Sequence, residues 1–292
     1  MDQDLNALNK QAIATARKYT SELAWPTILL VVLVWAVLIV NLTLFATGHL
    51  GLVPAMLVYA VVTYMSYTPL HEAAHSNIHG ANDRLQWLND VCGYLVAPLI
   101  MVPYSTHKVE HFTHHRYTNQ PDKDPDYVVS GMQGGFFAFL ICGFRFLWVQ
   151  NTFLFRDYWA IAPMREKVIY VVEVLFALGW RVAFIALISR EHTWVLLVFG
   201  YLAGAFFTAY WFAYRPHHPY DESARYRNTS SLIMPWWMKP LEWFWLGQNL
   251  HSVHHLFPRV PFYRYHELHR QIEPAMRAHG TPIIGLFSRR EL

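Results

Sequence analysis

The sequence has 292 residues, of which 54% are hydrophobic and only 15% are charged, and its formal net charge is +3. This composition is too apolar for an ordinary soluble domain, and so small a charge gives no reason to expect a nucleic-acid partner. Cys92 and Cys142 are the two cysteines, without paired spacing, so the sequence supports neither a disulfide framework nor an iron–sulfur cluster.

The apolar residues fall into stretches long enough to cross a bilayer, which takes about 20 helical residues. Residues 1–23 are charged and lack the apolar core of a secretory signal, so we expect this segment to stay in the cytoplasm. Two hairpins of spans follow, at residues 27–46 with 51–70 and at 168–188 with 194–214. We therefore predict an all-α integral membrane protein with four transmembrane helices and a cytoplasmic helical cap, as a single domain over residues 1–292.

Two further apolar stretches are ambiguous. Residues 91–103 are too few to span, and 135–155 carry Arg145 near the middle, where a charge costs at least about 2.5 kcal/mol in the bilayer centre. We expect both stretches to lie along the interface or to re-enter. Glu173 and Arg181, within the third span, are expected to face the bundle interior or to snorkel, and we assign them no chemistry.

The distribution of basic residues predicts the orientation. Of 23 Lys and Arg residues, Arg190 alone falls in a far-side turn, and Arg145 and Arg181 fall within apolar stretches. The other 20 share the side that carries the histidine motifs. By the positive-inside rule, this side and both termini are cytoplasmic.

Histidine is the unusual feature, with 17 residues of this type arranged in repeated motifs. The first motif has His71 and His75 at i and i+4; if the helix of the second span continues to His79, both imidazoles lie on one face and can chelate one ion. The second and third motifs place histidines at i, i+3 and i+4, which lets neighbours point towards two ions. The motifs comprise His71 and His75; His111, His114 and His115; and His251, His254 and His255, with His217 and His218 in the segment RPHHP.

Eight or nine histidines are too many for one metal ion. Two ions held by neutral ligands fit a redox centre that binds O2 beside an apolar substrate. The rival from another class is a membrane metal transporter or metal-binding protein, but transport sites lie near the bilayer midplane on broken helices. A haem protein is a weaker rival, since it needs one or two axial histidines.

The motifs HxxxH, HxxHH and HxxHH, with paired spans before the first and between the second and third, resemble the membrane fatty acid desaturase and hydroxylase superfamily over about residues 30–275. The resemblance implies an O2-dependent non-haem di-iron oxidoreductase, with two Fe ions, O2 as co-substrate and a separate electron donor such as ferredoxin. The implied ligands are His71, His75, His111, His114, His115, His251, His254 and His255, with His217 as the ninth and His218 as the alternative.

Finer segments, among them HEAAHSNIH, RPHHP and HHRYTNQPDKDPD, are most similar to carotenoid ring hydroxylases and ketolases. Hydroxylation or keto formation on a carotenoid ring is therefore the favoured substrate hypothesis, and desaturation or hydroxylation of a fatty acyl chain is the alternative. Small residues of the fourth span could provide space for a ring or allow close helix packing; they are Gly200, Ala203, Gly204 and Ala205.

Several residues are candidates for supporting roles. Asp124 and Asp126 could accept the second N–H of ligating imidazoles, or form a turn at Pro125. Asn249 could hold a metal-bound water or cap a helix. His107 has no usual counterpart in the superfamily and His79 has one only in some members, so both are possible supporting or structural residues. The aromatic run from Trp236 to Trp245 indicates an interfacial helix or lines the substrate entrance.

Overall fold

The computed structural model describes residues 4–188 and 190–288, and most of these residues are helical. The α-helices are α1 Leu5–Arg17, α2 Trp25–Ala46, α3 Leu52–Ala74, α4 Trp87–Ile100, α5 Tyr104–Tyr117, α6 Phe136–Phe153, α7 Met164–Leu187, α8 Thr193–Thr208, α9 Arg215–His217, α10 His251–Leu256 and α11 Tyr265–Ala278. Short 3-10 helices lie at Asp83–Leu85, Pro125–Gly134, Trp236–Trp245, Gln248–Leu250 and Phe262–Arg264, and π-helical turns at Leu154–Tyr158 and Ala209–Tyr214.

The all-α prediction missed one small sheet. Strands β1 Ser231–Ile233 and β2 Ile283–Gly285 pair in parallel, with Ser231 opposite Ile283. Three residues per strand are too few to show an alternating pattern in the sequence, and the pairing joins segments about 50 residues apart. The sheet links the segment before the third histidine motif to the C-terminal segment.

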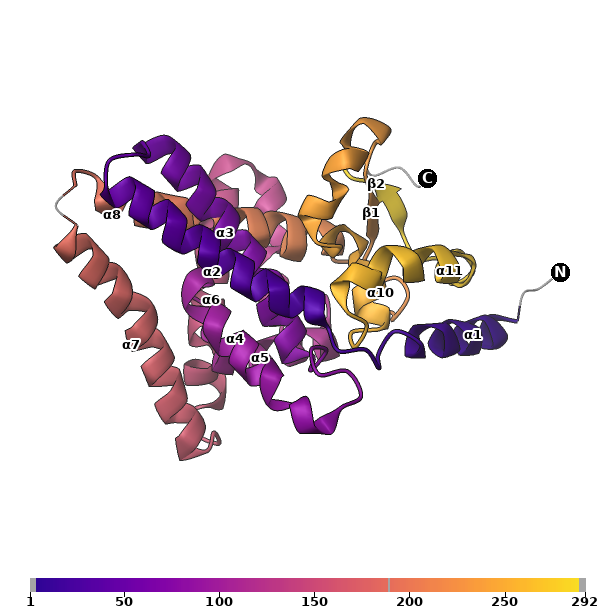
Figure 1. Cartoon of the computed structure of the whole chain (residues 1–292). Helices are drawn as coiled ribbons and strands as arrows, with labels where there is room; N and C mark the ends of the chain where they lie inside the picture. Colours follow the sequence, from indigo (N-terminus) through magenta and orange to yellow (C-terminus); the bar gives the residue numbers. More distant parts are fainter. Residues whose placement is uncertain (1–3, 189, 289–292) are drawn as a thin grey trace.

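Helix α3 lies between α2 and α8 in the centre of the apolar bundle (Figure 1). Its Tyr59 is fully buried, and a Cβ added at Gly200 of α8 would lie 2.9 Å from the Tyr59 ring. A Cβ at Gly204 would collide with the Ala60 backbone. Because these glycines allow α8 to pack closely on α3, the hypothesis that they widen a substrate opening is wrong for Gly200 and Gly204.

Within the described residues, five helical segments are long and apolar enough to cross a membrane, one more than the four predicted spans. They are Trp25–Ala46, Leu52–Ala74, Phe136–Tyr158, Met164–Leu187 and Thr193–His217. The additional segment contains α6, which is the ambiguous stretch 135–155. Arg145 is exposed on this helix.

Helices α4 and α5 form a bent pair with an angle of 96°. Helix α4 ends at Ile100, where Met101 takes a left-handed conformation with φ of 53°. The buried Arg181 of α7 donates hydrogen bonds to the carbonyl oxygens of Pro98 at 2.8 Å and Leu99 at 3.1 Å. A cation is thereby placed at the negative end of the α4 dipole.

The start of α5 is held by the second charged residue of α7. Glu173 accepts hydrogen bonds from the backbone N–H of Tyr104 at 2.6 Å and of Ser105 at 3.2 Å, and from the Ser105 hydroxyl at 2.6 Å. A carboxylate at a helix N-terminus satisfies free N–H donors and favours the dipole. Glu173 and Arg181 therefore face the neighbouring helices and stabilise both sides of one break.

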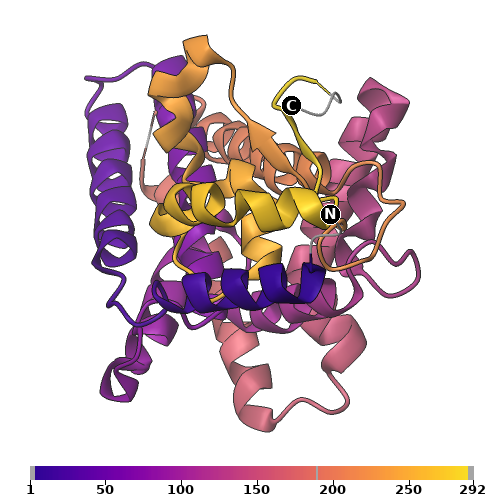
Figure 2. The same ribbon diagram turned by 90° about the vertical axis from the view of Figure 1, so that its right-hand side faces the viewer.

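The remaining elements form a cap at one end of the bundle. Figure 2 shows α1 and α11 side by side across this cap, with α10 beneath them. Helix α3 reaches the cap but ends at Ala74, short of the predicted His79. Its Glu72 accepts hydrogen bonds from the Asn77 side chain and from the backbone of Phe262, both at 3.2 Å. The chain thus turns after His75 and is tied to the segment before α11.

Candidate metal centre

Nine buried or half-buried histidines converge where α3, α5, α9 and α10 meet beneath the bundle. They form two groups. Within each group, the nitrogens that could bind a metal all lie within 4.8 Å of one another. The first histidine group is His71, His75, His111, His115 and His254, and the second histidine group is His114, His217, His251 and His255. These nine are the residues that the sequence and the resemblance single out as ligands.

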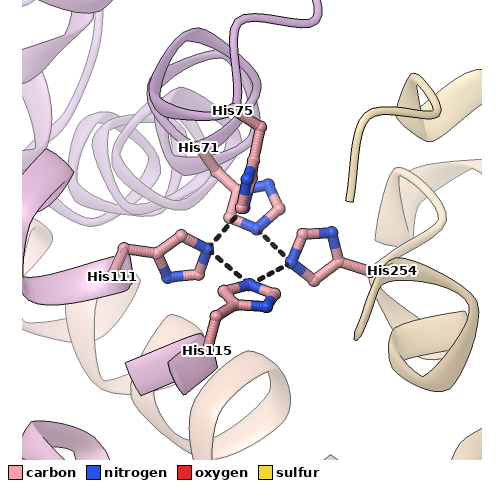
Figure 3. Close-up of side chains that lie close together, drawn as sticks. All are labelled: His71, His75, His111, His115 and His254. Atoms are coloured by element: carbon pink, nitrogen blue, oxygen red, sulfur yellow. Dashed lines mark hydrogen bonds between the residues drawn. The ribbon is translucent and has the colours of Figure 1, made fainter. Parts of the chain in front are cut away.

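The first histidine group is drawn in Figure 3, where five imidazoles from three helices point towards a common centre. The Nε2 atoms of His71 and His254 are 3.0 Å apart, and those of His75 and His111 are 2.8 Å apart. His115 Nε2 lies 3.1 Å from His111 Nε2 and 2.8 Å from His254 Nε2. The Nε2 atoms of these five imidazoles therefore surround one small space.

The second histidine group is arranged in the same way. His255 Nε2 lies 3.1 Å from His251 Nε2 and 3.4 Å from His114 Nε2. The ring of His217 completes the group, with its centroid 4.7 Å from that of His114 and 4.9 Å from that of His255. His115 and His255 stack at 4.3 Å, which places the two groups side by side.

Helical spacing explains how the histidines divide. Residues four apart lie on one helix face, whereas the residue three positions along points to one side of it. On α5, His111 and His115 join the first group and His114 joins the second. On α10 the roles are reversed, because His251 and His255 join the second group and His254 joins the first. Each HxxHH motif thus contributes to both groups.

Three of these imidazoles are oriented through their other ring nitrogen. Nδ1 of His114 lies 2.8 Å from Asp124 Oδ1, and because a carboxylate only accepts, this nitrogen carries the proton. Nδ1 of His254 lies 3.0 Å from the Tyr265 hydroxyl. In both cases Nε2 is the nitrogen turned towards the other histidines.

His217 is oriented by Asn119, whose side-chain N–H groups donate to the carbonyl oxygens of Glu222 and Asn228. The Asn119 oxygen therefore accepts from His217 Nδ1 at 3.2 Å. This leaves His217 Nε2 as a buried lone pair without a hydrogen-bond partner among the described residues. Such an atom is costly unless a cation or a donor meets it.

The donor set fits a pair of metal ions. In the second group, His217 Nε2 is a buried lone pair that faces the other imidazoles, and a cation at the centre of the group would meet it. Against the effect of burial, Asp124 and Asp126 raise the pKa of His114 to about 9, so its Nε2 would release a proton to bind a cation. Imidazole nitrogens would bind such an ion at about 2.1 Å, so ring nitrogens about 3 Å apart could share one ion. Burial, reinforced by neighbouring imidazoles, lowers the pKa of His75 and of His251 to about 3. Both imidazoles are therefore neutral at neutral pH, which is the form that binds a metal ion.

The other candidate histidines lie outside both groups. His79 accepts a hydrogen bond from the Asn89 side chain at 2.8 Å, and His218 contacts the Tyr214 hydroxyl at 3.3 Å. His107 stacks on His111 with centroids 5.0 Å apart. Its position beside a member of the first group agrees with a supporting role.

The carboxylate and amide candidates differ in what they contact. Asp126 Oδ2 lies 3.8 Å from His114 Nδ1, so Asp124 is the nearer partner of that imidazole. Asn249 donates to the Leu232 carbonyl at 3.0 Å and joins the third motif to β1, while its Oδ1 is buried without a partner among the described residues.

Sequence reasoning missed Asn119 and Tyr265 as orienting residues. Asn119 lies five residues before Asp124, and its backbone N–H donates to Asp124 Oδ2 at 2.7 Å. The position of Asn119 next to the second motif is a weak signal, and Tyr265 lies ten residues after the third motif with no pattern that marks it.

Comparison with known proteins supports the same class of protein. Residues 47–287 match the fatty acid desaturase family. The sn-1 acyl-lipid omega-3 desaturase (ferredoxin) of Nostoc sp. is 22% identical over 266 residues, covering 75% of this chain and 72% of the relative. The protein with the same description from Synechocystis sp. is 25% identical over 234 residues, covering 71% of this chain and 64% of the relative.

A third relative, the sn-1 oleoyl-lipid 12-desaturase of Anabaena variabilis, is 24% identical over 238 residues, covering 70% of this chain and 64% of the relative. The chain thus spans less than two thirds of the length of the last two relatives. The family match covers most of the chain and includes every histidine of both groups. The chain therefore belongs to the fatty acid desaturase family and is a membrane-bound oxidoreductase.

Proposed function

We propose that this chain is a di-iron desaturase that introduces a double bond into the acyl chain of a membrane lipid. The observation that carries the proposal is the pair of adjacent histidine groups, in a family whose named relatives are acyl-lipid desaturases. The nine histidines would hold two iron ions, and iron when bound supplies the redox chemistry that O2 reduction requires. Each turnover consumes one O2, two electrons and two protons, removes two hydrogen atoms from adjacent carbons and releases two waters.

The residues beside the first group form a mostly apolar surface. A cavity of only about 20 Å³ lies among α3, α5, α6 and α8, lined by Tyr67, Leu70, Ile100, Val102, His107, Phe146, Leu147, Gln150, Ala205 and Thr208. The Tyr67 ring lies 5.4 Å from that of His71, so this cavity adjoins the first group. Its mostly apolar lining suits a hydrocarbon substrate.

The comparisons favour the fatty-acyl alternative over the carotenoid hypothesis, because the named relatives act on acyl lipids. The "(ferredoxin)" in two of these names also supports an iron–sulfur protein as the separate electron donor. The oxidoreductase chemistry is common to both substrates.

The proposed topology has four crossings, with α6 along the membrane surface. His114 precedes α6 and His217 follows α8, yet both belong to one group, so an even number of crossings separates them. Helices α7 and α8 supply two. The exposed Arg145 in the middle of α6 suits an interfacial position better than the bilayer centre. By the positive-inside rule, the basic residues of the cap support a cytoplasmic position for the cap and both termini.

The test is turnover of purified, iron-loaded protein in lipid nanodiscs containing oleoyl phospholipid or β-carotene, with reduced ferredoxin and O2. We expect mass spectrometry to show acyl chains that have lost two hydrogens, and about two irons per chain. His255→Ala and His114→Ala should abolish turnover while the helices remain assembled. Oxygenated β-carotene with unchanged acyl chains would overturn the substrate, and active protein that holds one zinc and no iron would overturn the mechanism.

A further inference from the structure

A groove of about 280 Å³ lies on the cap between α1 and the segment that follows α10. Its floor is apolar and includes Leu256, Phe257 and Val260, all of which are buried. Three exposed arginines line it, namely Arg17, Arg225 and Arg259. We call this feature the arginine groove.

The charge of the arginine groove is unbalanced. Its described lining residues include three guanidinium groups and no carboxylate. Two other polar clefts mix charges, since one is lined by Asp90 with Lys108 and another by Asp221 and Glu222 with Arg227. Of these three clefts, the arginine groove best complements an acidic surface with an apolar centre.

The floor of the groove leads directly to the histidines. Leu256 follows His255 of the second group, and the Arg225 guanidinium donates to the Leu256 carbonyl at 3.2 Å. Phe257 donates its backbone N–H to the carbonyl oxygens of Val253 and His254, at 2.9 and 3.2 Å. A redox partner seated here would therefore be connected to both groups by a few covalent and hydrogen bonds of α10.

We propose that the arginine groove is the docking surface for an acidic iron–sulfur protein, which delivers single electrons to the centre through α10. The inference rests on the proposed function, because the proposed desaturation consumes two electrons that a donor must supply. Redox encounters use small, weak and salt-sensitive interfaces, which a shallow groove with a charged rim provides. Two reduced donors are oxidised in each turnover and supply the two electrons that the reaction consumes.

The experiment measures donor binding and turnover separately in the full-length protein. Binding of an oxidised, acidic [2Fe–2S] ferredoxin to detergent-purified apoprotein is measured at low and high salt, which needs neither iron nor activity. The variants are Arg17→Glu, Arg259→Glu and the double variant. The matched control is Arg84→Glu, which makes the same charge change at an exposed arginine between α3 and α4.

We expect wild-type binding to weaken with salt, and the double variant to bind at least about tenfold more weakly than wild type, with Arg84→Glu unchanged. In iron-loaded protein the double variant should show a higher KM for ferredoxin and unchanged turnover with the small reductant dithionite. Equal ferredoxin binding by wild type, groove variants and Arg84→Glu would overturn the docking site. A complete lack of turnover with either reductant would instead overturn the proposed function, whereas the binding assay would still decide the docking site.

Discussion

Replacing Asp124 with Asn perturbs the second histidine group without changing the size of the side chain. Asp124 Oδ1 accepts from His114 Nδ1 at 2.8 Å and from the backbone N–H of Asp126 at 2.9 Å, and Oδ2 accepts from the backbone N–H of Asn119 at 2.7 Å. An amide cannot accept at both ends. If its oxygen keeps His114, its NH2 faces the Asn119 N–H, and the residue that orients His217 is displaced.

The expected cost follows from the loss of these orienting bonds. Removing such a partner lowers metal affinity by about 10- to 100-fold, or about 1.4 to 2.7 kcal/mol. Because His114 and His217 both belong to the second group, the loss should concern one ion. Asp124→Asn protein should therefore retain about one iron per chain under a chelator concentration that leaves wild type with about two.

The assay is iron content by mass spectrometry after dialysis against a graded series of chelator concentrations. Asp122→Asn, at an exposed position two residues away, is the matched control and should behave as wild type. If Asp124→Asn holds two irons as tightly as wild type, the argument that Asp124 orients the second group is wrong. Equal loss of both irons would show that the two groups bind metal as one unit.

Three further outcomes are expected. Tyr265→Phe removes the hydroxyl partner of an imidazole in the first group and should weaken retention of the other iron by about 10- to 100-fold in the same chelator series; unchanged retention would contradict this. Glu173→Ala should lower the free energy of unfolding by about 0.5 to 2 kcal/mol, because it removes the cap of α5. Glu166→Ala, at an exposed position on the same helix, is the control, and equal Tm values for Glu173→Ala and wild type would refute the capping role. His49→Cys should react with an impermeant thiol reagent from outside the cell, whereas Asp122→Cys should not. Both native cysteines are buried, and labelling of Asp122→Cys but not His49→Cys would show that the proposed orientation is wrong.

The sequence predicts the histidines of the two groups better than it predicts what surrounds them. His111 and His115 are separated by one helical turn, so their common direction follows from local geometry. The partners of the imidazoles depend instead on where distant segments pack. Tyr265 meets His254 only because α11 folds back over α10, and Asn119 acquires its orientation from carbonyl groups more than 100 residues away.

The fold shows the same division between local and distant information. Apolar length predicts α2, α3, α7 and α8 because bilayer thickness acts on each helix independently. It does not predict that Glu173 caps the start of α5 or that Arg181 binds carbonyl groups at the end of α4. The sequence has no pattern that pairs a charge in an apolar helix with a helix break elsewhere. The same limit applies to β1 and β2, whose pairing depends on the packed cap.

The contacts that support the break between α4 and α5 can form only late in the synthesis of the protein. Glu173 follows Tyr104 by 69 residues, and Arg181 follows Pro98 by 83. At about 5 to 20 residues per second, roughly 3 to 14 s of synthesis separate the start of α5 from the residue that caps it. The nascent chain therefore enters the bilayer with this bend unsupported, and the second histidine motif gains its fixed position only when α7 is inserted.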